Sequence, residues 1–195
     1  MPEIVIAPAT ADRFDDAEHA LTGGGDGRSC QCQWWMMPNA EFQRNSPDER
    51  RALLREELGA AAPPPALIAY VDGEAAGWVR VGPRASQLRL ARTRDIAGAT
   101  PVPFDDPGVW AVTCFVVRRE HRGEGLTPLL LAAAVEHARE HGARMLEAYP
   151  YDTAAAKKHT NELYRGILSV FQAAGFREVA RPKPDRAIVS LELSA

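Results

Sequence analysis

The chain has 195 residues, of which 25% are charged and 46% hydrophobic, and its formal net charge is −3. This length predicts one domain over residues 1–195, because single globular domains usually run about 100–200 residues. The acidic balance disfavours a nucleic-acid partner, since affinity for a duplex comes mainly from lysine and arginine on phosphates. No apolar run approaches the roughly 18–20 residues of a membrane span, so we expect no membrane partner either.

The cysteines and the first residues predict a cytoplasmic protein. Residues 1–3 lack the positive and apolar regions that open a secretory signal. Cys30, Cys32 and Cys114 are too few for a disulfide scaffold, so we expect reduced thiols. Zinc normally takes four ligands from paired Cys-x₂₋₄-Cys units. One Cys-x-Cys pair does not supply them, so we expect no metal site.

In the first half of the chain the hydrophobic pattern predicts strands at residues 3–7, 66–71 and 75–81 and a helix over residues 10–21. Thr10 is expected to cap that helix. A second helix begins after Ser46, because this serine, Pro47 at the first position and Glu49 at the third form a capping box. Asp72-Gly73 predicts a hairpin turn between the two later strands, since glycine tolerates positive φ.

In the second half the pattern predicts strands at residues 109–118, 144–149, 176–180 and 187–193 and helices at residues 126–141 and 167–174. The strand at 109–118 is apolar on both faces, which is typical of a central strand covered on both sides. Helices and strands are interleaved and include one local hairpin. This order predicts an α+β domain.

The most informative segment is residues 117–128, where a hydrophobic strand enters a glycine-containing turn that opens a helix. Gly123 and Gly125 allow the backbone to approach a ligand with its amides pointing outward. The helix N-terminus adds unpaired N–H groups and partial positive charge, and Thr127 is the expected N-cap with Pro128 at the first position. Full charges come from Arg118, Arg119 and Arg122. These features predict a site for a pyrophosphate-like anion.

The turn does not match the common nucleotide-binding loops. It lacks the Gly-Lys-Ser/Thr ending of a Walker loop and the Gly-x-Gly-x-x-Gly spacing of a dinucleotide fold. The segment from Arg122 to Thr127 instead resembles the Gln/Arg-x-x-Gly-x-Gly/Ala signature of GNAT-type N-acetyltransferases, with Thr127 in place of the final Gly/Ala. Residues 171–179 resemble the superfamily's Tyr-x-x-x-Gly-Phe stretch, and the likeness spans about residues 66–193. The Cys-x-Cys-x-Trp-Trp segment, together with residues 147–150 and 171–176, further resembles a bacterial subgroup of the GNAT superfamily.

The resemblance implies a fold and a co-substrate. The fold is α+β, with a mixed, mostly antiparallel central sheet whose central strands splay apart and which helices flank. The co-substrate is acetyl-CoA, whose pantetheine arm would pair with the strand and whose pyrophosphate would lie on the turn. Carried over to this sequence, the cofactor-binding residues are Phe115, Val116 and Val117 along the arm and Arg122, Gly123, Glu124, Gly125, Leu126 and Thr127 at the pyrophosphate.

The implied function is transfer of an acetyl group from acetyl-CoA to a primary amine of a small molecule or peptide, directly in a ternary complex. The acceptor is expected beside residues 23–45, whose Trp34, Trp35, Met36 and Met37 either shape an apolar pocket or simply pack under the loop. We expect residues 82–107 to form a flap on the same side, with arginines that are solvated by default. A homodimer is left open.

The catalytic residues are less determined. In many GNAT enzymes the tyrosine of the second stretch protonates the departing thiolate, and here Phe171 takes that position. Tyr164, seven residues earlier, would share its helical face if the helix extends back, and Tyr149 is another donor. Glu147 is the first choice as general base, although a carboxylate there could equally bond a backbone amide or an arginine. The loss of the tyrosine also keeps open an acyl-CoA-binding sensor or regulatory module without turnover.

Overall fold

Seven strands form one sheet in the order β1-β2-β3-β4-β5-β7-β6, in a computed structural model that describes residues 2–193. The strands are β1 (Ile4–Pro8), β2 (Ala66–Val71), β3 (Glu74–Pro83), β4 (Val109–Val117), β5 (Met145–Ala148), β6 (Arg177–Lys183) and β7 (Arg186–Glu192). Neighbouring strands are antiparallel except for the parallel pair β4 and β5. The predicted mixed, mostly antiparallel sheet is therefore confirmed.

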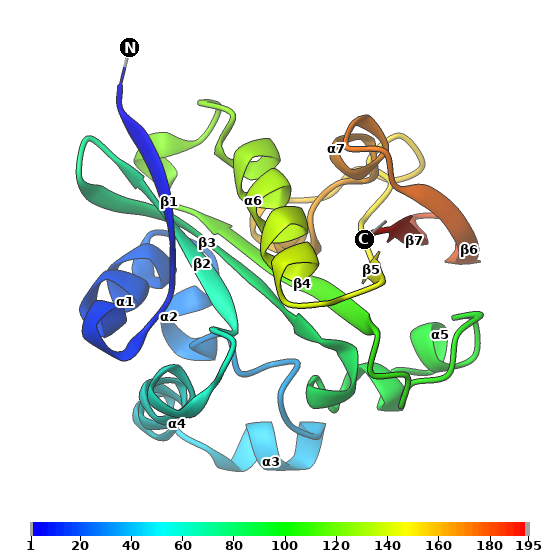
Figure 1. Ribbon diagram of the computed structural model, residues 1–195, viewed down its shortest axis with the longest axis horizontal. Coiled ribbons are helices and arrows are strands. Elements are labelled where there is room, and N and C mark those ends of the chain that lie inside the picture. Colours follow the sequence, from blue (N-terminus) through cyan, green and yellow to red (C-terminus); the bar gives the residue numbers. More distant parts are fainter. Residues whose placement is uncertain (1, 194–195) are drawn as a thin grey trace.

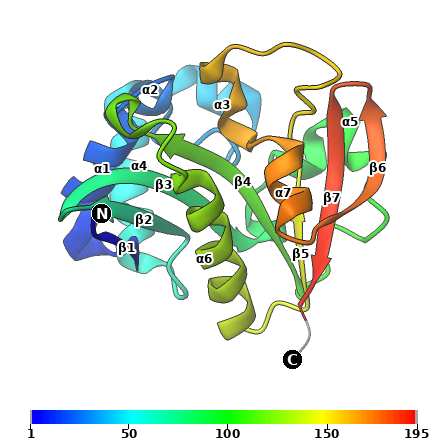
Figure 2. The ribbon, with the colours of Figure 1, turned by 90° about the horizontal axis from the view of Figure 1, so that it is seen from above.

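Helices cover both faces of the sheet (Figure 1). They are α1 (Phe14–Thr22), α2 (Gly27–Cys30), α3 (Asn39–Arg44), α4 (Pro47–Ala60), α5 (Arg94–Ala97), α6 (Leu126–Glu140) and α7 (Leu168–Ala173). Figure 2 shows α6 and α7 on one side of β3 and β4, and α1, α2 and α4 on the other. None of the helices within residues 2–193 has the length and apolarity needed to cross a membrane.

Two hydrophobic cores follow from the alternation of side chains along the strands. Val79 of β3 and Phe115 of β4 pack with Leu130 of α6 in the first core. Trp78 of β3 and Cys114 of β4 point to the opposite face, where they pack with α1 and α4. Because β4 contributes to both cores, it is buried from Val109 to Phe115, as its two apolar faces predict.

The sheet splits between β4 and β5. β4 pairs with β5 only over its first four residues, Val109–Val112, whereas its pairing with β3 continues to Val117. The register with β3 shifts at Thr113, and such a bulge bends a strand and increases its twist. Figure 2 shows the two strands together at one end and apart at the other. The predicted splay is confirmed, and it leaves the gap-facing edge of β4 beyond Val112 without a strand partner.

Of the local signals at Ser46, Thr10 and Asp72-Gly73, the first and the last are confirmed. Ser46 and Glu49 form the expected capping box of α4, with the Glu49 N–H donating to the Ser46 hydroxyl at 3.2 Å and the Ser46 N–H donating to Glu49 at 2.6 Å. Thr10 instead precedes a 3₁₀ turn, and its hydroxyl donates to Asp12 rather than capping α1. The residue after Asp72-Gly73 begins β3, as the hairpin prediction requires.

The N-cap predicted for α6 is wrong. Gly125, at φ 79° in the left-handed region, caps the helix, and Thr127 lies inside its first turn. Pro128 is therefore the third helical residue rather than the first. Proline is tolerated there because the first N–H groups of a helix have no intrahelical acceptor.

The segment 82–107 does not form the expected flap, because it packs into the core. It forms short helical turns whose Leu90 and Ile96 are buried in a third core with Trp35. Its Arg84 and Arg89 are also buried, so the expectation of solvated arginines is wrong for these two. The segment is a packing layer beneath the end of β4.

Candidate active site

A cavity of about 700 Å³ lies against the unpaired edge of β4. Its walls come from the chain between α1 and α3, from residues 114–117 of β4, from the turn that leads into α6, and from residues 160–170. Apolar side chains dominate the lining. The split sheet therefore exposes one stretch of strand backbone to a largely apolar chamber.

The structure brings the predicted cofactor residues together along this cavity. All but one of them line it: Phe115, Val116, Val117, Arg122, Gly123, Gly125, Leu126 and Thr127. The exception is Glu124, which is exposed and whose carboxylate lies 3.0 Å from His121 Nδ1. The strand end and the turn thus form one continuous surface.

The turn depends on its glycines. Gly123 and Gly125 have φ of 87° and 79°, a region that costs other L-residues about 1–2 kcal/mol. A Cβ added at either position would meet no heavy atom within 4 Å, so their outer faces are open. The turn therefore presents bare backbone at the N-terminus of the 15-residue helix α6, an arrangement that favours anions.

Of the three predicted arginines, one reaches the cavity. Arg122 lines it, and its guanidinium lies so close to Gly24 that a Cβ added there would fall 2.4 Å from Nη2. Arg118 instead pairs with Glu120 at 2.6 Å and donates to the His19 carbonyl. Of the expected cationic cluster, Arg122 is therefore the arginine that faces the cavity, where the N-terminus of α6 adds partial positive charge.

Aromatic side chains line the region beyond β4. Trp34, Trp35, Phe42 and Tyr164 belong to this wall. The Trp35 indole donates to the carbonyl oxygen of Thr113 at 3.1 Å, which satisfies a backbone acceptor where β4 leaves β5. The segment 23–45 therefore borders the cavity as predicted, and its aromatic residues both line the chamber and hold the split strand.

Tyr164 is the predicted catalytic residue that lines the cavity. The Arg165 Nε–H donates to its hydroxyl oxygen at 3.3 Å, and burial raises the pKa of the phenol above its usual value. A raised pKa keeps the hydroxyl protonated at neutral pH, so it can donate a proton. The helix does not extend back to Tyr164, because Gly166 at φ 80° separates the 3₁₀ turn Thr160–Arg165 from α7.

Glu147 and Tyr149 lie outside the cavity lining. The Glu147 carboxylate is fully buried and accepts from Arg84 at 3.0 Å, from Thr100 at 2.6 Å and from the Tyr149 hydroxyl at 2.6 Å. Burial and this carboxylate raise the pKa of Tyr149. The contacts match the alternative of a carboxylate that bonds an arginine, and they leave Glu147 no path to an acceptor in the cavity.

Phe171 also faces away from the cavity. Its side chain is fully buried, and its ring packs edge-on against the rings of Phe115 and Phe176, with centroid distances of 6.0 and 5.2 Å. Val170 is the residue of α7 that lines the cavity. The phenylalanine at the position of the family's tyrosine is thus a core residue, and Tyr164 is the tyrosine that lines the cavity.

Sequence reasoning missed part of the lining. Asn161 and Leu163 reach the cavity from a 3₁₀ turn that has no hydrophobic period to reveal it. Cys32 also lines the cavity, although its sequence position predicted only a reduced thiol. Within residues 2–193 no three His, Cys, Asp or Glu side chains gather in a way that could hold a metal ion.

Solved structures of similar fold include proteins named as acetyltransferases. An N-acetyltransferase from Staphylococcus aureus Mu50 superposes with a TM-score of 0.57 at 17% identity, covering 98% of this chain and 99% of that one. A putative GNAT-family acetyltransferase from Desulfovibrio desulfuricans gives 0.57 at 18% identity, covering 98% and 100%. A ribosomal-protein-alanine N-acetyltransferase from Brucella melitensis gives 0.57 at 19% identity, covering 97% and 99%.

These likenesses establish the fold, and the family rests on the sequence. No curated protein matches the chain significantly. The sequence model of the acetyltransferase (GNAT) family, however, matches residues 31–166, which include β4, the glycine turn and Tyr164. The chain therefore belongs to the GNAT family of acetyltransferases.

Proposed function

We propose that the protein transfers an acetyl group from acetyl-CoA to a primary amine of a small molecule or peptide. The observation that carries this proposal is the continuity of the cavity, which joins an anion-binding turn, an unpaired strand edge and an aromatic chamber. The turn suits the pyrophosphate of acetyl-CoA, the strand edge suits its amide-containing pantetheine arm, and the aromatic chamber suits an acceptor with an apolar body. The family supports acyl transfer in general.

The geometry favours direct transfer in a ternary complex. A pantetheine arm laid along the free edge of β4 from the turn would carry its thioester toward Cys114 and the aromatic wall. There an amine can attack the thioester carbonyl while strand amides polarise it. Tyr164, whose phenol stays protonated, is the residue we assign to protonate the leaving thiolate.

Calorimetry with acetyl-CoA, followed by thiol release across an amine panel, tests the proposal. The panel should hold arylalkyl amines, polyamines and a peptide with an N-terminal alanine, because one structural relative is named for that acceptor. We expect binding of acetyl-CoA and amine-dependent release of CoA. Binding without release on any amine would favour the sensor function, and failure to bind any CoA species would exclude both functions.

Arg122→Glu should weaken acetyl-CoA binding about 10–100-fold. Hydrogen bonds to charged groups are worth about 1.5–3 kcal/mol, and each 1.4 kcal/mol is a factor of about ten. Arg119→Glu is the matched control, because it makes the same charge change in the same turn at an exposed side chain that does not line the cavity. Titration calorimetry should show the loss in the first variant alone. Equal losses of affinity in both variants would mean that Arg122 acts through the overall positive charge near the turn rather than through a direct contact with the cofactor.

A further inference from the structure

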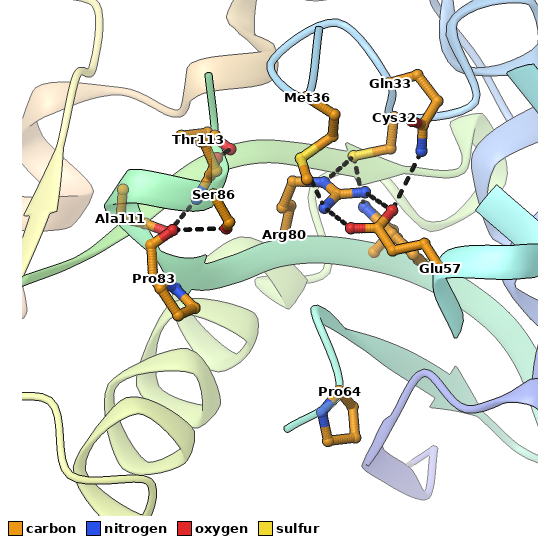
Figure 3. Close-up of polar contacts among 12 residues, drawn as sticks. Cys32, Gln33, Met36, Glu57, Pro64, Arg80, Pro83, Ser86, Ala111 and Thr113 are labelled. Carbon is orange, nitrogen blue, oxygen red and sulfur yellow. Dashed lines mark hydrogen bonds and ion pairs between the residues drawn. The ribbon is translucent and has the colours of Figure 1, made fainter. Parts of the chain in front are cut away.

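A buried sulfur cluster borders the cavity. Cys32 is 3% exposed, and its Sγ accepts an N–H from Trp78 Nε1 at 3.1 Å and another from Arg80 Nε at 3.2 Å. Figure 3 shows the sulfur atoms of Cys32 and Met36 and the carboxylate of Glu57 around the Arg80 guanidinium. Cys32 and Cys114 both line the cavity. Two nitrogen donors therefore converge on one sulfur atom in its wall.

The charges around this sulfur favour the thiolate. Glu57 accepts from both terminal nitrogens of Arg80, at 2.7 and 2.8 Å, which leaves the Arg80 Nε–H for Cys32. Burial alone raises the pKa of Cys32, but the Cys114 thiol, the charge of Arg80 and its N–H, and the N–H of Trp78 outweigh it and lower the pKa to about 6. Burial raises the pKa of Cys30 to about 11, so Cys30 is a neutral thiol.

Several elements packed around Cys32 bring charged or titratable groups to it. The titratable groups that face the cluster are Arg80 from β3, Glu57 from α4, Cys114 from β4, Cys30 from α2 and, next to Cys114, Tyr164. Among these, Glu57 is held by Arg80, while the pKa values of Cys30, Cys114 and Tyr164 are raised. The thiolate of Cys32 is therefore the basic group of this cluster, and its sulfur lies at the cavity wall.

The backbone is bent to place this sulfur. Gln31 and Cys32 have φ of 49° and 54°, so two consecutive residues other than glycine occupy the left-handed region. L-residues rarely adopt that conformation, and it is retained where the surroundings enforce it, often at functional sites. Here it directs the Cys32 side chain toward β3 and β4.

We propose that Cys32 is the catalytic base, whose thiolate takes the proton from the ammonium group of the acceptor. The inference rests on the proposed function and adds a substrate class to it. Among the described residues that line the cavity, Asp26 is the sole carboxylate, and it is exposed. With Trp34 and Phe42 in the wall, the acceptor is a primary amine attached to an aromatic or aliphatic body.

The proton balance of the step closes. The ammonium gives one proton to the Cys32 sulfur, and the free amine then forms the N–C bond to the thioester carbonyl carbon. The C–S bond breaks, the CoA sulfur leaves with the electron pair, and Tyr164 protonates it. The amide nitrogen returns its second proton to the Tyr164 phenolate, and the Cys32 thiol releases its proton to solvent, so one proton is liberated per turnover.

The test compares pH profiles of thiol release for the wild type, Cys32→Ser, Cys32→Asp and Cys30→Ser, with the best arylalkyl amine of the panel. We expect wild-type kcat to fall as the pH drops through about 6. In Cys32→Ser, kcat at neutral pH should be about 10²-fold or more below wild type, as expected when a general base is removed. The fall of kcat at acidic pH, the acidic limb of the profile, should disappear in this variant. Cys32→Asp should recover part of kcat, and its acidic limb should lie at lower pH, because a carboxyl group is a stronger acid than a thiol. Cys30→Ser should keep the wild-type limb.

The other outcomes overturn the inference in distinguishable ways. Wild-type turnover with an unchanged acidic limb in folded Cys32→Ser would exclude Cys32 as the base. An acetyl adduct on Cys32, found by intact-mass analysis after mixing wild type with acetyl-CoA alone, would make it a nucleophile instead. Absence of turnover in the wild type with every amine would remove the proposed function and this inference with it.

A measurement on the wild type alone guards against variants that fail to fold. Alkylation by iodoacetamide at increasing pH, with peptide mapping, should label Cys32 with a midpoint near pH 6. Labelling that begins only in the ordinary thiol range, near pH 8.5, would show that the thiolate is absent at neutral pH and would overturn the proposal.

Discussion

Tyr164→Phe should lower kcat about 10²–10⁴-fold, the usual contribution of a positioned general acid. The substitution removes the hydroxyl that accepts from Arg165 while keeping the ring beside Trp35 and Tyr151. We therefore expect the affinity for acetyl-CoA to stay within a few-fold of wild type. Stopped-flow or steady-state thiol release gives kcat, and calorimetry gives the affinity, so a loss confined to kcat identifies an effect on the chemical step.

The matched control is Tyr149→Phe, which also removes one phenol but does so outside the cavity. Its kcat should remain near the wild-type value. The pKa of Tyr164 is raised, so activity should persist to alkaline pH, because the acid loses its proton only above the ordinary tyrosine value of about 10. A large loss of kcat in Tyr149→Phe with none in Tyr164→Phe would reverse the assignment.

Local chemistry made much of the fold predictable. The capping box of Ser46 and Glu49 involves residues three apart, and the Asp72-Gly73 turn joins adjacent strands. β4 was recognisable because seven consecutive residues are buried, which imposes an apolar run on the sequence itself. In each case the physical cause lies within a short stretch of chain, so a sequence window contains the relevant information.

The errors arose where the cause lies far away in sequence. Arg84 is solvated by default until Glu147, 63 residues later, supplies a buried partner. Trp35 looked like an ordinary apolar residue, yet its indole donates to Thr113, 78 residues away, at the bulge of β4. A sequence alone gives no sign of such pairs, because each partner is individually unremarkable and only the fold brings them together.

The candidate site divides in the same way. The turn from Arg122 to Thr127 was identifiable because its glycines and its helix start are contiguous, although the N-cap predicted at Thr127 was wrong and lies at Gly125. Left-handed glycine caps carry no side-chain signal. The candidate catalytic side chains come from separate elements, so their positions relative to the cavity depend on the fold. Tyr164 lies in a 3₁₀ turn that ends at Gly166, whereas Glu147 is held in the core by Arg84.

Arg84→Met should lower the free energy of unfolding by about 3–5 kcal/mol, the usual cost of leaving a buried charge without its partner. Arg84 and Glu147 have fully buried side chains, and the guanidinium also donates to Thr100 and to the carbonyl oxygens of Val102 and Pro103. Removing the guanidinium leaves the Glu147 carboxylate buried without a positive partner and removes the hydrogen bonds that hold residues 100–103. Equilibrium unfolding in urea, followed by tryptophan fluorescence, measures the change.

Two comparisons separate this cause from general damage to the core. Arg84→Met combined with Glu147→Leu should be more stable than Arg84→Met alone, because an apolar pair of similar volume removes the stranded charge. Arg139→Met, at a solvent-exposed pair with Glu136 on α6, should change the unfolding midpoint little, since exposed ion pairs contribute little. If the double variant were no more stable than Arg84→Met, the loss would come from packing around the methionine. The Glu147 carboxylate would then be tolerated in the core without its arginine, held by Thr100 and Tyr149.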